Sequence, residues 1–142
     1  MLVEHARNLV GIPNASHAEY GTDGVQVITA LACSLQDQAI AINIRPDSRL
    51  ETLYQGRRTA LERTTCSYGL APEIQHIAGE KGMRIAATDG TGEVRAIERT
   101  GHPFFIGTLY QPQLRSSEAA PHPVFVGMIS SAIASSRGIH SA

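Results

Sequence analysis

The sequence has little of several features that mark particular classes of protein. It contains no Trp, three Phe and four Tyr, and its two cysteines, Cys33 and Cys66, are far apart. Two distant cysteines without a Cys-x-x-Cys pair do not indicate a disulfide framework or a zinc site. No apolar run is long enough to cross a bilayer, and residues 1–13 lack the apolar stretch of a signal peptide. We therefore expect a cytoplasmic protein with reduced thiols and no membrane partner.

Charge of one sign is also scarce. The chain has 12 basic and 13 acidic residues, a net charge of -1, and no basic run longer than Arg57-Arg58. A surface with this balance gives no electrostatic support for binding nucleic acid. The hydrophobic fraction of 42% and the length of 142 residues are those of one globular domain. We expect a single domain over residues 1–142.

Apolar spacing predicts an α/β fold. A helix is expected at the N-terminus, ended by Gly11 and Pro13, and a second helix begins at Pro72. Strand 104–110 is apolar without alternation, which favours burial on both faces of a three-layer, mostly parallel central sheet. The remaining expected elements are strands at 25–35, 39–46 and 59–65, a β-hairpin of 83–89 and 93–99, and a last helix with Phe125, Met128, Ile129, Ala132 and Ile133 on its apolar face.

A candidate ligand site follows the strand 104–110. In open α/β sheets, ligands bind at the carboxyl ends of strands, and the segment Tyr110–Gln113 occupies such an end. The glycine-rich hairpin turn TDGTG lacks the spacing of a phosphate-binding loop. The six histidines show no metal-ligand spacing, so we expect no metal and no cofactor. His102 and His122 each precede a proline, which favours a role in a turn.

Three segments carry a resemblance to a known family. EVRAIERTGHPFFIGTLYQPQL with PHPVFVGMISSA, VEHARNLVGIPNASHAEY, and CSYGLAPEI resemble the carboxyl part of the glutamine amidotransferase domain of CTP synthase. They are also similar to small standalone proteins related to the CTP synthase C-terminal region, some of which are selenoproteins. The resemblance spans residues 2–134. It implies a class I glutamine amidotransferase-like, flavodoxin-like fold that is incomplete at its N-terminus, because the family's nucleophile elbow precedes the first matched segment.

The resemblance implies a catalytic triad that is degenerate here. Gln111 stands at the position of the family histidine and Gln113 at that of the glutamate. A carboxamide does not titrate near neutral pH, so Gln111 cannot accept the proton of a thiol nucleophile. Neither Cys33 nor Cys66 lies in a glycine-flanked elbow that would make it the nucleophile. Loss of a triad costs on the order of 10⁶ in rate, so we expect no glutaminase activity from this chain.

The resemblance also assigns substrate-binding positions. Glu19 matches the glutamate that receives the amino group of glutamine, and Tyr68 matches a tyrosine of the same site. Ser67 replaces the arginine that holds the substrate carboxylate, and serine cannot replace a bidentate charge pair. Glu19 as a solvated loop carboxylate and Tyr68 as a packing residue are the plainer alternatives.

Three functions remain open from the sequence. The first is a degenerate amidotransferase-like domain that binds a metabolite, such as glutamine or a related amino acid, or a protein partner. The second is a fragment of an active CTP synthase-type amidotransferase of pyrimidine nucleotide biosynthesis, whose other half supplies a cysteine or selenocysteine. The third is different hydrolytic or redox chemistry, with Gln111 donating a hydrogen bond to an oxyanion. Because an incomplete sheet has an open edge, we expect self-association or a protein partner there.

Overall fold

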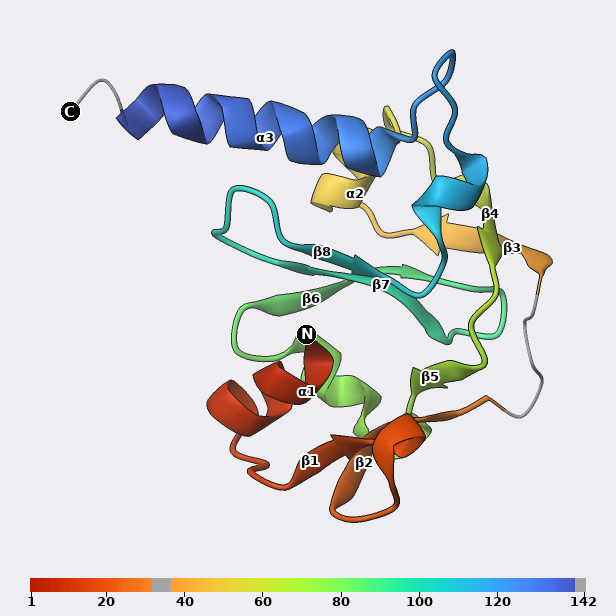
Figure 1. The fold of residues 1–142 in the computed structure, drawn as a ribbon, viewed down its shortest axis with the longest axis vertical. Coiled ribbons are helices and arrows are strands. Elements are labelled where there is room, and N and C mark those ends of the chain that lie inside the picture. Colours follow the sequence, from red (N-terminus) through yellow and green to blue (C-terminus); the bar gives the residue numbers. More distant parts are fainter. Residues whose placement is uncertain (32–36, 140–142) are drawn as a thin grey trace.

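A computed structural model describes residues 1–31 and 37–139, and its centre is a five-stranded sheet (Figure 1). The strand order is β4-β3-β6-β7-β8, and a second, three-stranded sheet has the order β1-β2-β5. The strands are β1 (Ala15–His17), β2 (Val25–Ala30), β3 (Gln38–Ile44), β4 (Thr59–Thr64), β5 (Tyr68–Leu70), β6 (Met83–Thr88), β7 (Val94–Arg99) and β8 (Ile106–Thr108).

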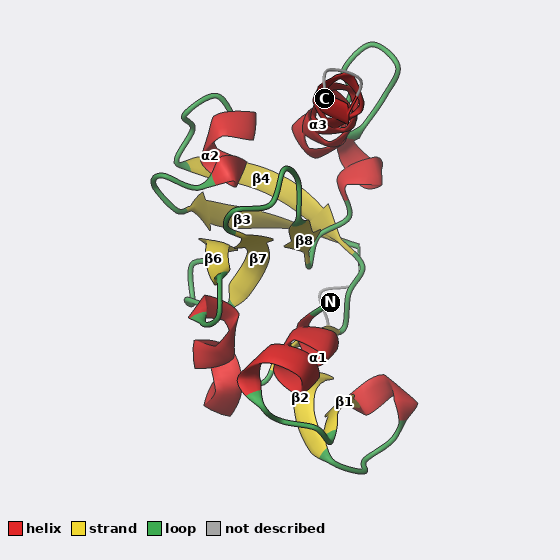
Figure 2. Cartoon of the chain, turned by 90° about the vertical axis from the view of Figure 1, so that its left-hand side faces the viewer, coloured by secondary structure: helices red, strands yellow, loops and turns green. Residues whose placement is uncertain are grey.

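Helices lie on both sides of the five-stranded sheet. Helices α2 (Arg49–Leu53) and α3 (Pro123–Ile139) lie over one side, and α1 (Leu2–His5) with the small sheet lies on the other (Figures 1 and 2). Helix α1 continues as a π-helix, Ala6–Val10, and short 3₁₀ helices span Ala18–Tyr20, Pro72–Gly79 and Pro112–Arg115. The arrangement agrees with the predicted α/β class, and the single domain over residues 1–142 stays a prediction.

Local signals explain where the first helices end and begin. Gly11 has a φ of 87° and ends the N-terminal helix in the left-handed conformation that glycine adopts without strain. Ser48 caps α2 by accepting a hydrogen bond at Oγ from the Glu51 N–H, 2.9 Å away. The carboxylate of Glu98, on β7, accepts the N–H groups of Arg49 and Leu50. This buried carboxylate joins the start of α2 to β7, an inner strand of the sheet.

The prediction of a mostly parallel central sheet is wrong for the strands of this chain. Every pairing in the five-stranded sheet is antiparallel, and among the described pairs the parallel one is β1–β2. For β6–β7 and β7–β8 the physical reason is the length of the connections, residues 89–93 and 100–105, because parallel neighbours need a crossover of a dozen or more residues. Burial of strand 104–110 was therefore evidence of covering layers, not of strand direction.

The last helix is correctly predicted, but the face that it buries is not. Val124 and Gly127 are buried, whereas Met128, Ile129 and Ile133 are about half exposed. The helix meets α2 at Gly127, where a Cβ atom would run into the side chain of Leu53. Its position is thus set by contacts of its first turns rather than by its apolar stripe.

Several other expected elements differ in extent. The expected strand 25–35 is β2 and covers residues 25–30, and the segment 32–36, with Cys33, lies outside the described residues. The expected strand 104–110 is shorter in the structure, where β8 covers residues 106–108. The expected helix from Pro72 is a 3₁₀ helix with non-helical backbone at Ile74. No helix among the described residues has the length and hydropathy to span a membrane. The cytoplasmic location stays a prediction.

Candidate functional site

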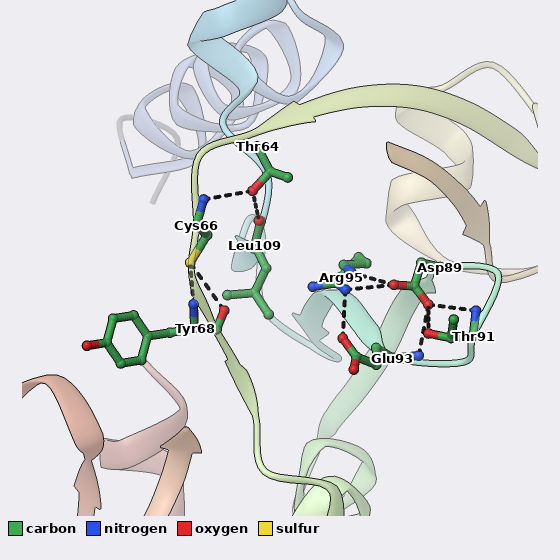
Figure 3. Close-up of polar contacts among 8 residues, drawn as sticks. All are labelled: Thr64, Cys66, Tyr68, Asp89, Thr91, Glu93, Arg95 and Leu109. Carbon is green, nitrogen blue, oxygen red and sulfur yellow. Dashed lines mark hydrogen bonds and ion pairs between the residues drawn. The ribbon is translucent and has the colours of Figure 1, made fainter. Parts of the chain in front are cut away.

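The loop after β8 is held against the end of β4 by a ladder of hydrogen bonds. The Gln111 N–H donates to the Arg63 carbonyl at 2.9 Å, and Gln111 Oε1 accepts the Thr65 N–H at 2.8 Å. The Thr64 hydroxyl donates to the Leu109 carbonyl at 2.9 Å (Figure 3). The side chain of Gln111 is therefore fixed by its backbone neighbours. Its side-chain amide oxygen already accepts the hydrogen bond from the Thr65 N–H.

The second glutamine of the loop has a different environment. Gln113 is exposed on the 3₁₀ helix Pro112–Arg115, whereas Gln111 is half-buried. Both side chains are amides, and neither accepts or releases a proton near neutral pH. The loop at this end of the sheet therefore carries hydrogen-bonding groups but no acid or base at positions 111 and 113.

The predicted substrate-side residues Glu19 and Tyr68 meet through His17. The ring centroids of His17 and Tyr68 are 5.1 Å apart, and those of His17 and Tyr20 are 5.4 Å apart. His17 Nδ1 accepts the Glu19 N–H at 3.1 Å, so a neutral ring carries its proton on Nε2. Glu19 itself is exposed. His17 thus contacts the ring of Tyr68 and the backbone N–H of Glu19.

His17 was missed because the histidines were searched for metal-ligand spacing. The local signal was present in the segment His17-Ala18-Glu19, where a side chain that accepts the N–H two residues later caps a short helix. His17 also links two strands of the small sheet, since β1 carries it and β5 carries its neighbour Tyr68.

Cys66 and Ser67 lie between the Gln111 loop and Tyr68. Cys66 Sγ donates to the Tyr68 carbonyl at 3.2 Å and accepts the Tyr68 N–H at 3.5 Å (Figure 3). The Ser67 carbonyl accepts the Leu31 N–H at 2.8 Å, and Ser67 is half-buried. The Cys66 thiol is thus bonded to backbone groups of Tyr68, and the expectation that Cys66 is not a nucleophile stays a prediction.

A pocket of about 230 Å³ includes some of these residues in its lining. They are His17, Cys66 and Tyr68, and Thr108 of β8 and Met1 also line it. The predicted residues Glu19, Ser67 and Gln111 do not line the pocket, but each is within two positions of a residue that does. The structure therefore brings Tyr68 to the pocket directly and the other positions next to residues that line it.

A second polar cluster lies on the other side of the same loop and is fully buried. The Tyr54 hydroxyl donates to Glu62 Oε1 at 2.7 Å and lies 3.2 Å from both the Tyr110 hydroxyl and His122 Nε2. His122 Nε2 is 3.2 Å from Glu62 Oε2, and His122 Nδ1 accepts the Val124 N–H. Because Nδ1 is an acceptor, the proton of a neutral ring is on Nε2, which faces both Glu62 and the Tyr54 hydroxyl. We call Tyr54, Glu62, Tyr110 and His122 the buried network.

Burial governs the ionisation of the tyrosines in this network. Burial first, and then the neighbouring Tyr110 and Glu62, raise the pKa of Tyr54 far above its ordinary value. Burial also raises the pKa of Tyr110, against the hydrogen bond with Tyr54, which lowers it. Both hydroxyls therefore stay protonated and act as hydrogen-bonding groups that hold the loop, rather than as bases.

In the glycine-rich hairpin turn, the side chain of Asp89 accepts the hydrogen bonds of the backbone N–H groups. Asp89 Oδ1 accepts the N–H groups of Thr91 and Glu93, and Asp89 Oδ2 accepts two hydrogen bonds from Arg95 (Figure 3). Burial opposes ionisation of Asp89, but the hydrogen bonds from Thr91 and Arg95 outweigh it and lower the pKa of this carboxyl. The backbone donors that would bind a phosphate thus already bind a carboxylate. Within residues 1–31 and 37–139, no group of three or more His, Cys, Asp or Glu side chains is placed to hold a metal ion.

Solved structures with the same fold include a known glutaminase. The Trypanosoma brucei CTP synthase glutaminase domain with bound acivicin superposes with a TM-score of 0.85 and 22% identity, over 93% of this chain and 55% of that one. A putative GMP synthase component from Thermoplasma acidophilum superposes with a TM-score of 0.58 and 12% identity, over 81% of this chain and 52% of that one. These likenesses confirm the predicted class I glutamine amidotransferase-like fold.

Curated relatives agree with the structural match. The chain is 31% identical, over 98% of its length, to CTP synthase of Thermosynechococcus vestitus, and 28% identical over 93% to that of Methanopyrus kandleri. The chain thus matches a glutamine amidotransferase region of the CTP synthase type. It spans about a quarter of the length of these relatives, 27% and 26% respectively. No protein-family model matches the chain.

Proposed function

We propose that this amidotransferase-type chain binds glutamine or a closely related amino acid beside Tyr68 and does not hydrolyse it. The observation that carries the proposal is the state of Gln111, whose amide carbonyl is bonded to the Thr65 N–H where the family has its base. A carboxamide is too weak a base to take a proton from a thiol or from water, and here its oxygen accepts a backbone N–H. The site can therefore orient a ligand but lacks the group that starts glutaminase chemistry.

The histidines near the loop do not replace that base. His122 and Glu62 are bonded to each other in the buried network, and neither lines the small pocket. His17 lines the pocket, but its Nδ1 is occupied by the Glu19 N–H. In our proposal His17 supports the wall that carries Tyr68 and Glu19, because it contacts both.

The ligand is inferred from the charges that remain. The exposed carboxylate of Glu19 suits an α-ammonium group, and the pocket of about 230 Å³ accommodates a small amide side chain. Ser67 offers no cation for an α-carboxylate. A charge-assisted hydrogen bond contributes about 1.5–3 kcal/mol, so its loss should leave binding roughly 10- to 100-fold weaker than at a complete site.

The proposal is tested by titrating the chain with glutamine in a calorimeter and by measuring ammonia release in parallel. We expect weak saturable binding that Glu19→Gln weakens about 10-fold, since it removes the charge opposite the ammonium. Glu118→Gln, which removes an exposed carboxylate from the 116–121 loop, is the matched control and should not change binding. Absence of binding, or ammonia release by the unaltered chain, would contradict the proposal.

Restoring histidine at position 111 and glutamate at position 113 tests whether the chain lacks only the base or also the nucleophile. The variant Gln111→His with Gln113→Glu should still release no ammonia from glutamine, because neither cysteine has the flanking glycines of a nucleophile elbow in the sequence. Ammonia release by this double variant that disappears with Cys66→Ala or Cys33→Ala would show that one of these thiols is the nucleophile and that our assignment is wrong.

A second candidate function is a part of an active CTP synthase-type amidotransferase. The observation in its favour is coverage, since the chain matches 55% of the solved glutaminase domain. In that case another polypeptide segment supplies the thiol or selenol, and Gln111 lies beside it. The intact mass of the protein from its source cells distinguishes the two: a mass near 15.2 kDa favours the binding role, and a substantially larger mass reopens catalysis.

A further inference from the structure

His17 lines the pocket of about 230 Å³ with an imidazole ring that uses one of its two nitrogens within the chain. Nδ1 accepts the Glu19 N–H at 3.1 Å, and no residue in the described part of the chain bonds to Nε2. Since Nδ1 is an acceptor, a neutral ring carries its proton on Nε2. His17 therefore keeps one N–H donor for a ligand at this pocket.

The backbone and two neighbouring rings fix the orientation of His17. The register of β1 against β2 shifts by one residue between Ser16 and His17, and an irregularity of this kind turns a strand locally and redirects a side chain. The bond at Nδ1 makes His17 the cap of the 3₁₀ helix Ala18–Tyr20. The ring also lies against Tyr68 and Tyr20 at tilts of 51° and 53°. The Nε2–H is thus held in place before a ligand binds, which lowers the entropic cost of binding.

Most other side-chain donors around the pocket are already bonded. The Arg95 guanidinium is paired with two carboxylates of its own hairpin, and the Cys66 thiol and the Thr108 hydroxyl each donate to a backbone carbonyl. Among the described residues that line the pocket, the side-chain donors without such a partner are the Nε2–H of His17 and the Tyr68 hydroxyl. Of these two, His17 is the one bonded directly to the Glu19 backbone.

We propose that His17 binds the α-carboxylate of the ligand through its Nε2–H, so that the site selects α-amino acids over simple amines. The inference rests on the proposed function, in which the Glu19 carboxylate binds the α-ammonium group. Both groups of an amino acid are attached to one carbon atom, so their two partners must lie close together. Glu19 and His17 meet this condition, because they are two positions apart and share a hydrogen bond.

This contact suits a weak binding site. A neutral N–H that donates to a carboxylate forms a charge-assisted hydrogen bond, but it lacks the full charge and the two parallel bonds of a guanidinium. His17 therefore supplies recognition of the carboxylate without the affinity of an arginine. The ring keeps its bond to the Glu19 N–H while it does so, because the two nitrogens serve different partners.

Two glutamine analogues separate this role from simple support of the pocket wall. A ring that only supports the wall should affect every ligand of the pocket alike. A ring that binds the carboxylate should affect only ligands that have a carboxylate. Glutaramate is glutamine without its amino group, and 4-aminobutanamide is glutamine without its carboxylate. Each compound therefore removes one of the two charged groups.

The experiment is a chemical-shift titration of the isotope-labelled chain by NMR with glutamine and both analogues. His17→Ala should weaken glutamine and glutaramate about 10-fold and leave 4-aminobutanamide within about twofold. Glu19→Gln should show the opposite selectivity, with glutamine and 4-aminobutanamide weakened about 10-fold and glutaramate within about twofold. The crossed pattern identifies which residue contacts which charged group.

Two further variants control for folding and for the loss of a histidine. His17→Asn keeps a side-chain oxygen that can cap the Glu19 N–H, but its amide is too short to reach the position of Nε2. It should therefore lose affinity as His17→Ala does, while the spectrum of the free chain stays folded. His76→Ala removes an exposed histidine of the 3₁₀ helix Pro72–Gly79, outside the pocket lining, and should leave all three affinities unchanged.

The outcomes distinguish this inference from the proposed function. If glutamine binds and His17→Ala weakens all three ligands equally, the ring only supports the wall and the inference is wrong. If His17→Ala changes none of them, the carboxylate is bound elsewhere, for example by the amino group of Met1, which also lines the pocket, and the inference is again wrong. If the unaltered chain binds none of the three compounds, the proposed function fails together with the inference.

Discussion

Two segments of this chain share one local structure and differ in their surroundings. In His102-Pro103-Phe104 and in His122-Pro123-Val124, the histidine Nδ1 accepts the N–H of the residue two positions later, at 3.1 and 3.2 Å. Each ring also lies edge-on to a phenylalanine three positions later, with centroids 5.5 and 6.1 Å apart. His102 lies in a bend and His122 directly before α3, and their turn role stays a prediction.

The difference lies in the second ring nitrogen. His102 is exposed, whereas His122 is 3% exposed and its Nε2 faces Glu62 and Tyr54. The same dipeptide thus forms a surface turn in one place and anchors a buried hydrogen-bond network in the other. The local sequence determines the hydrogen bond at Nδ1 of each histidine. Residues distant in the chain, Glu62 and Tyr54, supply the contacts of His122 Nε2.

The largest effect is expected from removing the two imidazoles in turn. His122→Ala should lower the free energy of unfolding by about 3 kcal/mol, because it leaves Glu62 and Tyr54 with unpaired buried groups. His102→Ala removes the same local hydrogen bond at the surface and should cost about 0.5 kcal/mol. Urea denaturation of both variants measures the difference. Equal losses would mean that the turn, not the network, carries the stability.

A smaller effect is expected from a single hydroxyl of the network. Tyr54→Phe keeps the ring but removes the hydrogen bond to Glu62, so it should cost about 2 kcal/mol. Tyr20→Phe is the control, since Tyr20 is 86% exposed, and it should leave stability unchanged within about 0.5 kcal/mol. Combining Tyr54→Phe with His122→Ala should cost less than the sum, because the two residues share partners. Strict additivity would argue against one network.

The mildest test is an alkaline titration of the same hydroxyls. Since burial raises the pKa of Tyr54 and Tyr110 in the folded chain, their contribution is complete below about pH 10 and is lost as pH rises above it. At pH 10.5 each should reduce the free energy of unfolding by about 1 kcal/mol. Unfolding at that pH should add the tyrosinate absorbance of these residues. A stability that is flat from pH 9 to 10.5 would contradict their burial.

The elements with local signals were predicted well. Gly11 ends the first helix in a left-handed conformation, and the hairpin at Gly90–Gly92 joins β6 and β7 as expected. Strand direction was predicted wrongly, because it depends on which segments pair. Alternating burial in β3 and burial on both faces of β7 occur in the same antiparallel sheet.

The site was only partly predictable for a related reason. The positions of Gln111 and Gln113 came from a resemblance between segments, and their roles stay predictions. The buried network was missed because its members are separated along the chain, with Tyr54 and His122 lying 68 positions apart. His17 was missed although its signal is local, since the histidines were weighed as metal ligands.

The absence of a side chain at Gly127 sets the height of α3 above the sheet. The Leu53 side chain occupies the space that a Cβ would need, so the helix rests on α2 through bare backbone. Gly127→Ala would push α3 away from α2, and Leu53→Ala would let the two helices approach more closely. Leu53 and Gly127 also line a groove of about 1180 Å³ between α3 and β4. The size of the side chain at position 127 therefore controls the width of this groove.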